Sequence, residues 1–236
     1  MPSVGIVGGL GPEATIDYYR RILAAWERQS PGSSPSIVID SLDVHTGLRL
    51  AANDHAALTE YLLASVQRLA SAGVDFVAMS ANTAHLVFDA LEERSPVPLL
   101  SIVEVCAAKA TAHHYKRLAL LGTRFTMEAS FYPTVFARHD IEVFPPDQSN
   151  REWIHERYVG ELLKGDFRDT TRARIVEIVH QMREQHQLDA VILAGTELPL
   201  LLQSSTMAGL PVLDTTALHV AAIVDRLGGR DTQGLV

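Results

Sequence analysis

The chain has 236 residues, of which 47% are hydrophobic, and a formal net charge of -8 at pH 7. This length can hold one large or two small domains with a buried core. The acidic balance argues against a surface for nucleic acids or anionic membranes, which would need a basic patch. No apolar run is long enough to cross a bilayer, and no signal-peptide pattern opens the sequence, so we expect a cytoplasmic protein.

Short apolar runs alternate with helical patterns along the chain. The predicted strands are Val4–Val7, Ser36–Ile39, Asp75–Met79, Pro98–Ile102, Leu118–Leu121, Ile141–Phe144, Ala190–Leu193 and Pro211–Leu213. Continuous apolar runs of this length suit parallel strands that are covered on both faces. Residues 54–72 and 170–187 between them have apolar side chains at helical spacing. The alternation predicts right-handed βαβ units and an α/β fold.

The predicted strands fall into two sets with matching motifs. "VGIVGGLGPEATIDYY" compares with "LALLGTRFTMEASFY", and "FVAMSANTAH" compares with "AVILAGTELP". We therefore expect two pseudo-symmetric, doubly wound lobes, each with a four-stranded, mostly parallel sheet. One lobe would contain residues 1–103 and 214–236, including a C-terminal helix, and the other residues 104–213. Ligands of open α/β sheets bind at the carboxyl ends of the strands, so the site is expected in the cleft between the lobes.

Five spaced motifs resemble those of the aspartate/glutamate racemase family. They are "GIVGGLGPEAT", "ANTAH", "LLGTRFTM", "GTELPLLL" and "PVLDTTALH", and they follow one another from Val4 to His219. Members of this family are amino-acid racemases that work without pyridoxal phosphate. The resemblance implies two α/β lobes with a small acidic amino acid or dicarboxylate bound between them, no cofactor, and a homodimer.

The family's two catalytic cysteines have no counterpart in this chain. In the family, one thiol removes the α-proton of the substrate and the other returns a proton on the opposite face. The resemblance places these thiols at Ala81 and Gly195, where neither a methyl group nor a hydrogen can exchange a proton. The chain's one cysteine, Cys106, lies in a predicted helix, and we interpret it as a core residue.

Most of the expected binding groups are nevertheless present. By resemblance, hydroxyls and backbone N–H groups at the strand ends would hold a substrate carboxylate, and Lys164 or Arg49 would meet its distal carboxylate. The candidate substrate-binding residues are Gly9, Leu10, Arg49, Asn82, Thr83, Thr123, Thr126, Lys164 and Thr196. Some have a simpler explanation, namely a tight turn for Gly9, helix capping for each threonine and a solvated helix end for Lys164.

Candidates for proton transfer come from the same motifs. Thr83 is close to the missing thiol, although a hydroxyl is a very weak acid without a neighbouring base. His85 has a useful reference pKa of about 6.5 but could equally brace the loop. Glu197 could act as a base or bind an ammonium group, and it could also stabilise a helix N-terminus. The remaining histidines do not form a set with ligand spacing, so we expect no metal.

Three functions fit these observations. The first is a racemase- or epimerase-type isomerase of Asp/Glu-like amino acids that uses non-thiol groups or water. The second is another isomerase or a lyase, in which the carboxylate-binding groups stabilise an enolate-like intermediate of a small carboxylic acid. The third is a catalytically silent protein that binds an acidic metabolite. We place the racemase first because the set of motifs is retained.

Overall fold

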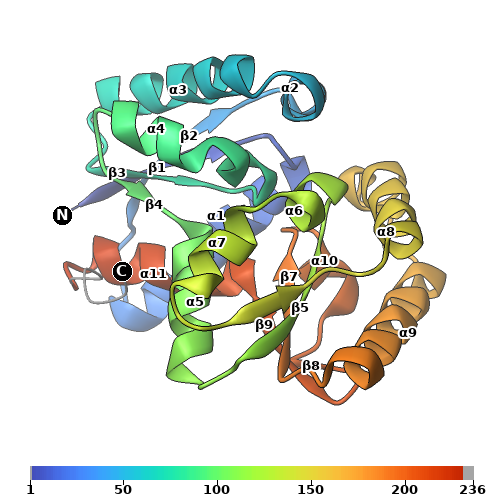
Figure 1. Cartoon of the computed structure of the whole chain (residues 1–236). Helices are drawn as coiled ribbons and strands as arrows, with labels where there is room; N and C mark the ends of the chain where they lie inside the picture. Colours follow the sequence, from blue (N-terminus) through green and yellow to red (C-terminus); the bar gives the residue numbers. More distant parts are fainter. Residues whose placement is uncertain (1, 231–236) are drawn as a thin grey trace. The chain divides into compact units, whose positions relative to one another are not determined.

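Two α/β units make up residues 2–230, which are the residues described by the computed structural model (Figure 1). The first unit runs from the N-terminal strand to Val105 and resumes at Thr216, and the second unit is Cys106–Thr215. The expected α/β fold with two lobes and parallel sheets is confirmed. The end of the predicted C-terminal segment, residues 231–236, lies outside the described residues.

The first unit contains a four-stranded parallel sheet with the order β2-β1-β3-β4. Its strands are β1 (Ser3–Gly8), β2 (Ser36–Ser41), β3 (Phe76–Met79) and β4 (Leu99–Leu100). Its helical segments are α1 (Pro12–Gln29), α2 (Val44–Asn53), α3 (His55–Ser71), the 3-10 helix η1 (Thr83–Val87), α4 (Phe88–Arg94) and α11 (Thr215–Leu227), which begins one residue before the unit does. The strand predicted over Pro98–Ile102 is shorter in the structure, because Ile102 already begins helix α5 (Ile102–Ala112).

Alternate residues of β1 face different helices, as the period of a strand requires. Val4 and Ile6 pack with the buried face of α1 and with α11. Gly5 points the other way, where an added Cβ would lie 3.1 Å from Leu69 of α3. Figure 1 shows α3 on one side of this sheet and α1 and α11 on the other. Both faces are covered, which explains why the strands read as continuous apolar runs.

The second unit contains a five-stranded sheet with the order β6-β5-β7-β9-β8. Its strands are β5 (Arg117–Gly122), β6 (Glu142–Phe144), β7 (Ala190–Ala194), β8 (Thr206–Met207) and β9 (Leu210–Asp214). Its helical segments are α6 (Arg124–Glu128), α7 (Phe131–Ala137), α8 (Gln148–Gly160), the 3-10 helix η2 (Leu162–Lys164), α9 (Asp169–His186) and α10 (Leu198–Leu202).

The extra strand of this sheet, β8, corrects the prediction of four strands. It pairs antiparallel with β9 through a two-residue turn, Ala208-Gly209, in which both residues have positive φ (49° and 74°). This is the conformation of a tight hairpin turn, for which Asn-Gly is the usual sequence signal. Alanine gives no such signal. The turn is supported by Arg183, whose guanidinium donates to the Ala208 carbonyl at 2.6 Å.

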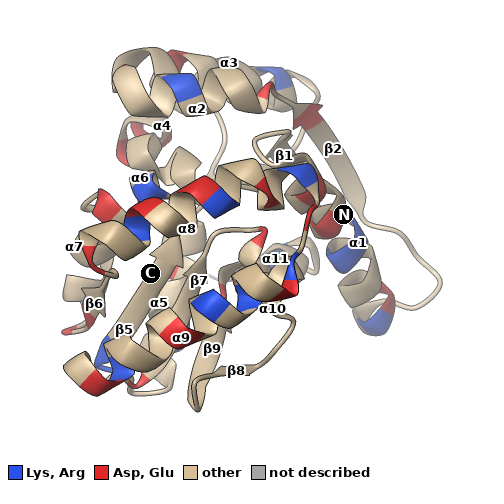
Figure 2. Ribbon diagram, turned by 90° about the vertical axis from the view of Figure 1, so that its right-hand side faces the viewer, with Lys and Arg blue, Asp and Glu red and all other residues tan. Residues whose placement is uncertain are grey.

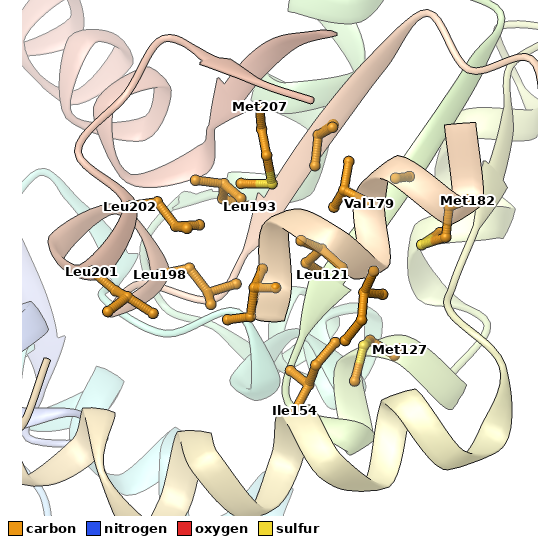
Figure 3. Packing of buried hydrophobic residues seen from close by; sticks show 14 of the residues in the cluster. Leu121, Met127, Ile154, Val179, Met182, Leu193, Leu198, Leu201, Leu202 and Met207 are labelled. Carbon is orange, nitrogen blue, oxygen red and sulfur yellow. The ribbon is translucent and has the colours of Figure 1, made fainter. Parts of the chain in front are cut away.

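One large apolar cluster lies between the second sheet and its helices (Figure 3). Leu121 and Leu193 supply the strand side, and Ile154 of α8, Val179 of α9 and Leu198 of α10 supply the helix side. Along α8 and α9, Lys and Arg alternate with Asp and Glu (Figure 2), which is the pattern of helices with one buried and one solvated face. Among residues 2–230, none of the helices is both long enough and apolar enough to cross a membrane.

Candidate functional site

The glycine turn after β1 is fixed by backbone contacts. Gly9 has a φ of +79°, and a Cβ there would overlap the backbone of Leu42. Only glycine fits such a position without strain. Its N–H donates to Thr15 Oγ1 at 2.9 Å, and Leu10 next to it lies half-buried against Gly47 of α2. The tight turn, given above as the simpler explanation for Gly9, therefore does require a glycine at this position.

The end of β3 is tied to the same turn. Ser80 is buried, its hydroxyl donates to the Val7 carbonyl at 3.2 Å, and it lies 3.2 Å from Thr15 Oγ1. Ala81 follows, with 6% of its surface exposed, and then come buried Asn82 and half-buried Thr83. The structure thus brings Gly9 and the Ala81–Thr83 segment to the carboxyl end of one sheet, because β1 and β3 are parallel neighbours.

The buried side chain of His85 is held by two backbone groups. Its Nε2 accepts from the Ile102 N–H at 3.2 Å, so Nδ1 carries the proton and donates to the Ala81 carbonyl at 3.1 Å. Burial lowers the pKa of His85 to about 4, and the neutral ring stacks on Phe88. Because both ring nitrogens are occupied, this geometry favours the bracing interpretation of His85 over a role in proton transfer.

A second buried histidine, His219 of α11, holds the neighbouring backbone. Its Nε2 lies 3.1 Å from the Leu100 carbonyl and its Nδ1 lies 3.0 Å from the Tyr18 hydroxyl. The carbonyl can only accept, so Nε2 donates and Nδ1 accepts. Burial, and then the nearby His85, lower the pKa of His219 to about 3. The sequence pointed to His219 only as the end of a motif, and gave no sign of this role.

In the second unit, two threonines meet at the end of β5. Thr123 Oγ1 accepts from the Thr126 N–H at 3.3 Å and lies 3.2 Å from Thr126 Oγ1, so Thr123 caps the short helix α6. Gly122 pairs in register with Ala194 of β7, and a Cβ on Gly122 would lie 2.5 Å from the Ala194 carbonyl. This close approach places the threonines and the residues that follow Ala194 at the same edge of the sheet.

The end of β7 is built around Tyr158, a residue of α8 that the sequence did not single out. A Cβ on Gly195 would lie 2.6 Å from Cε2 and 2.8 Å from the hydroxyl oxygen of Tyr158. The Tyr158 hydroxyl donates a hydrogen bond to Glu197 Oε2. Thr196 Oγ1 also donates to Oε2, at 3.0 Å, and the Glu197 N–H donates to the Tyr158 oxygen at 3.3 Å. Thr196 and Glu197, both predicted, are thus brought together with an unpredicted phenol.

Helix α8 contributes a second ionisable group one turn before Tyr158. His155 is half-buried, and its Nδ1 accepts from the Arg124 N–H at 3.3 Å, at the start of α6. Burial and the Arg124 charge lower the pKa of His155. The spacing of three residues puts both side chains on one face of α8. In the sequence, the spacing of His155 and Tyr158 within "WIHERY" is the feature that indicates that the two side chains share a face of the helix.

The two cationic candidates are exposed. Arg49 lies on α2 and Lys164 ends the 3-10 helix η2, just before Gly165 in the left-handed region (φ 72°). The segment that carries Lys164 is anchored by the buried carboxylate of Glu161. This carboxylate contacts Arg157 at 3.0 Å and Arg168 at 3.2 Å, and it accepts from Thr171 at 2.6 Å.

Cys106 is wholly buried, and burial, with a smaller effect of Asp214, raises the pKa of its thiol. Such a thiol is inert. It therefore does not supply a thiol at Ala81 or Gly195, the positions at which the resemblance leads one to expect cysteines. Within residues 2–230, no group of three or more His, Cys, Asp or Glu side chains is arranged to hold a metal ion.

Known proteins resemble this chain over nearly its whole length. The model of the Asp/Glu/hydantoin racemase family matches residues 7–223. The broad specificity amino-acid racemase RacX of Bacillus subtilis is 24% identical over 218 residues, which are 91% of this chain and 93% of RacX.

Solved structures agree with this assignment. An aspartate racemase homologue from Pyrococcus horikoshii has a TM-score of 0.80 and 28% identity, covering 97% of this chain and 100% of its own. A candidate Asp/Glu racemase from Yersinia pestis has a TM-score of 0.85 and 33% identity, covering 96% and 99%. The match of the family model over most of the chain, together with these likenesses, shows that the protein belongs to the Asp/Glu/hydantoin racemase family.

Proposed function

We propose that this protein is an amino-acid isomerase of the racemase or epimerase type, and that its substrates are acidic amino acids such as aspartate and glutamate. Family membership supports the amino-acid racemase function. The observation that favours a carboxylate substrate is the cluster of hydroxyls at the end of the second sheet. Thr123, Thr126 and Thr196 follow two neighbouring strands whose last residues are in register.

Hydroxyls at such an edge suit a carboxylate because the hydrogen of each can rotate from its present acceptor, which for Thr196 is Glu197, to a charged oxygen of the ligand, and hydrogen bonds to charged groups are stronger than neutral ones. All three threonines are buried, so little water competes for them. Asn82 and Thr83 form the equivalent segment of the first unit, after β3. Following the resemblance, we assign these residues to binding of the α-carboxylate, and the exposed Lys164 and Arg49 to the distal carboxylate.

The proposed isomerase uses no thiol. Ala81 and Gly195 occupy the positions that the resemblance assigns to the thiols, and Cys106 is sealed in the core. Proton transfer must therefore use oxygen or nitrogen groups, or water. An alkylating reagent should leave the activity of the folded protein intact, whereas it would inactivate a racemase that depends on thiolates.

The test is a proton-exchange experiment on the whole protein. L- and D-aspartate and L- and D-glutamate are each incubated with the protein in D₂O, and the α-proton signal is followed by NMR. Chiral chromatography of the same samples measures inversion. We expect loss of the α-proton signal with at least one of the four compounds, and no effect of iodoacetamide pretreatment.

Absence of exchange with all four compounds would contradict the proposal. Calorimetry with the same compounds then separates the remaining functions. Binding without exchange would identify a catalytically silent acidic-metabolite protein, and absence of binding would exclude acidic amino acids as ligands.

A further inference from the structure

We infer that Tyr158 and Glu197 form the proton-transfer pair of this site, and that they exchange the α-proton of the substrate on one face only. This inference rests on the proposed function and adds the residues that perform it. Two features of the second unit support it: the space that Tyr158 occupies beside Gly195, and the hydrogen bonds that join its hydroxyl to Glu197.

Tyr158 fills the space of a side chain at position 195. The Cβ of any other residue there would lie 2.6 Å from Cε2 of its ring, a distance that real Cβ atoms essentially never show, and 3.0 Å from Cζ. The φ angle of Gly195 is not positive, so its backbone conformation does not require a glycine at this position. It is needed because the ring lies there. The phenol oxygen lies 2.8 Å from the same Cβ position. It thus occupies the space that the first side-chain atoms of another residue at position 195 would fill.

The hydroxyl is joined to a carboxylate that one further donor, Thr196, also holds in place. Glu197 Oε2 accepts from both Tyr158 and Thr196, while the Glu197 N–H points back to the Tyr158 oxygen. Tyr158 is 3% exposed and Glu197 is 1% exposed. In such a dry environment hydrogen bonds between polar groups are strengthened, and their geometry is fixed.

The resting protonation state suits a pair that accepts a proton. Burial, and then the charge of Glu197, raise the pKa of Tyr158 well above its ordinary value of 10. The phenol therefore keeps its proton at neutral pH. A proton that enters the pair must come to rest on the carboxylate of Glu197, with the phenol as the relay.

The proton transfer can be written with all atoms accounted for. The C–H bond at the α-carbon breaks, its electron pair remains on the substrate as an enolate-like carbanion, and the proton forms a new bond to the phenol oxygen. The original phenol proton moves at the same time to Glu197 Oε2. Reversal of these two transfers returns a proton to the same face. The hydrogen returned is the one that the phenol oxygen holds, so in D₂O deuterium enters the substrate once this phenol hydrogen has exchanged with solvent.

The corresponding segment of the first unit has no similar pair. Ala81 presents a methyl group, and His85, the titratable residue of that motif, has both ring nitrogens bound to backbone groups. Inversion, which needs a proton on the opposite face, then depends on water or on the weakly acidic hydroxyl of Thr83. We therefore expect α-proton exchange with retention of configuration to be faster than inversion.

The test compares the wild type with Tyr158→Phe and Glu197→Gln in the NMR exchange assay described above. Tyr158→Phe keeps the ring in place and removes only the hydroxyl. Tyr132→Phe is the matched control, because Tyr132 is also a wholly buried tyrosine of the second unit, on α7. Thermal melting verifies that each variant is folded, and calorimetry measures substrate affinity separately.

We expect exchange in the wild type to be faster than inversion. Both site variants should lose at least about 100-fold in kcat with little change in KM, as is usual when a proton-transfer group is removed, and Tyr132→Phe should retain activity. Retained exchange in folded Tyr158→Phe overturns the inference and leaves the proposed function standing. Equal rates of exchange and inversion in the wild type overturn the one-face mechanism. A wild type that exchanges none of the four amino acids overturns the proposed function, and this inference with it.

Discussion

The ring of Tyr158 lies where a side chain on Gly195 would have to be, with its Cε2 atom 2.6 Å from the Cβ position of residue 195. The two residues come from different elements, helix α8 and the turn after strand β7. Each therefore restricts what the other can be. This relationship leads to a stability prediction that needs no knowledge of the substrate.

Gly195→Ala should destabilise the protein by about 1–3 kcal/mol, because an extra methyl group forces the Tyr158 ring out of a well-packed position. In urea unfolding, the free energy should fall by that amount, and Tyr158→Ala in the same chain should remove most of the penalty. Gly160→Ala is the matched control, since a Cβ on Gly160 meets nothing within 4 Å. Additive effects of the two substitutions would show that the ring does not occupy this space.

His85 and His219 should make the protein less stable in mild acid. Both are buried as neutral rings, with pKa values of about 4 and about 3, whereas unfolding restores a value near 6.5. Below pH 6.5 the unfolded chain binds more protons than the folded one. These two groups should therefore leave the free energy of unfolding constant above pH 6.5. Below pH 6.5 the free energy of unfolding should fall, by up to about 1.4 kcal/mol per pH unit for each histidine.

The measurement is the melting temperature between pH 7.5 and pH 5. His219→Gln, although destabilised at neutral pH, should show a shallower fall. His180→Gln, at an exposed position of α9, is the control and should keep the slope of the wild type. An unchanged slope in the His219 variant would mean that its ring is already protonated or solvated in the folded state.

Thr196→Val and Thr83→Val should each weaken the binding of acidic amino acids. Each replaces a donor to the substrate carboxylate by a methyl group, and a hydrogen bond to a charged group contributes about 1.5–3 kcal/mol. Calorimetry with aspartate and glutamate measures the loss, and Thr111→Val, at an exposed position near the end of α5, serves as the control. Wild-type affinity in both site variants would place the carboxylate elsewhere.

The local patterns of the sequence were enough to predict most of the fold. The run at Leu118–Leu121 is the core of β5, and the apolar spacing in residues 170–187 matches α9. The antiparallel strand β8 was missed because its turn uses alanine at a positive φ. A backbone conformation that the local residue does not favour cannot be recognised from that residue.

The candidate site was predicted in part, for a related reason. Thr123, Thr196 and Glu197 stand directly after strands, so the parallel sheet itself brings them to one edge. Tyr158 comes from a helix whose orientation is set by the packing of Ile154 and its neighbours in the core. Nothing near Tyr158 in the sequence indicates that its ring lies over Gly195, because that contact depends on the tertiary fold.

The last prediction concerns positions 81 and 195, to which the resemblance assigns the family's cysteines. If positions 81 and 195 are those of the family's cysteines, Ala81→Cys with Gly195→Cys should create a thiol pair. The Tyr158 ring, however, leaves no room for a side chain at 195. The double variant should therefore be destabilised and gain no racemisation, whereas adding Tyr158→Ala should free the position. We expect the triple variant to invert aspartate or glutamate and to lose this activity on alkylation, while Cys106, buried in the core, stays unreactive in the parent. Chiral chromatography before and after iodoacetamide is the measurement. A folded triple variant that binds substrate but does not invert it would show that residues 81 and 195 do not flank the α-carbon.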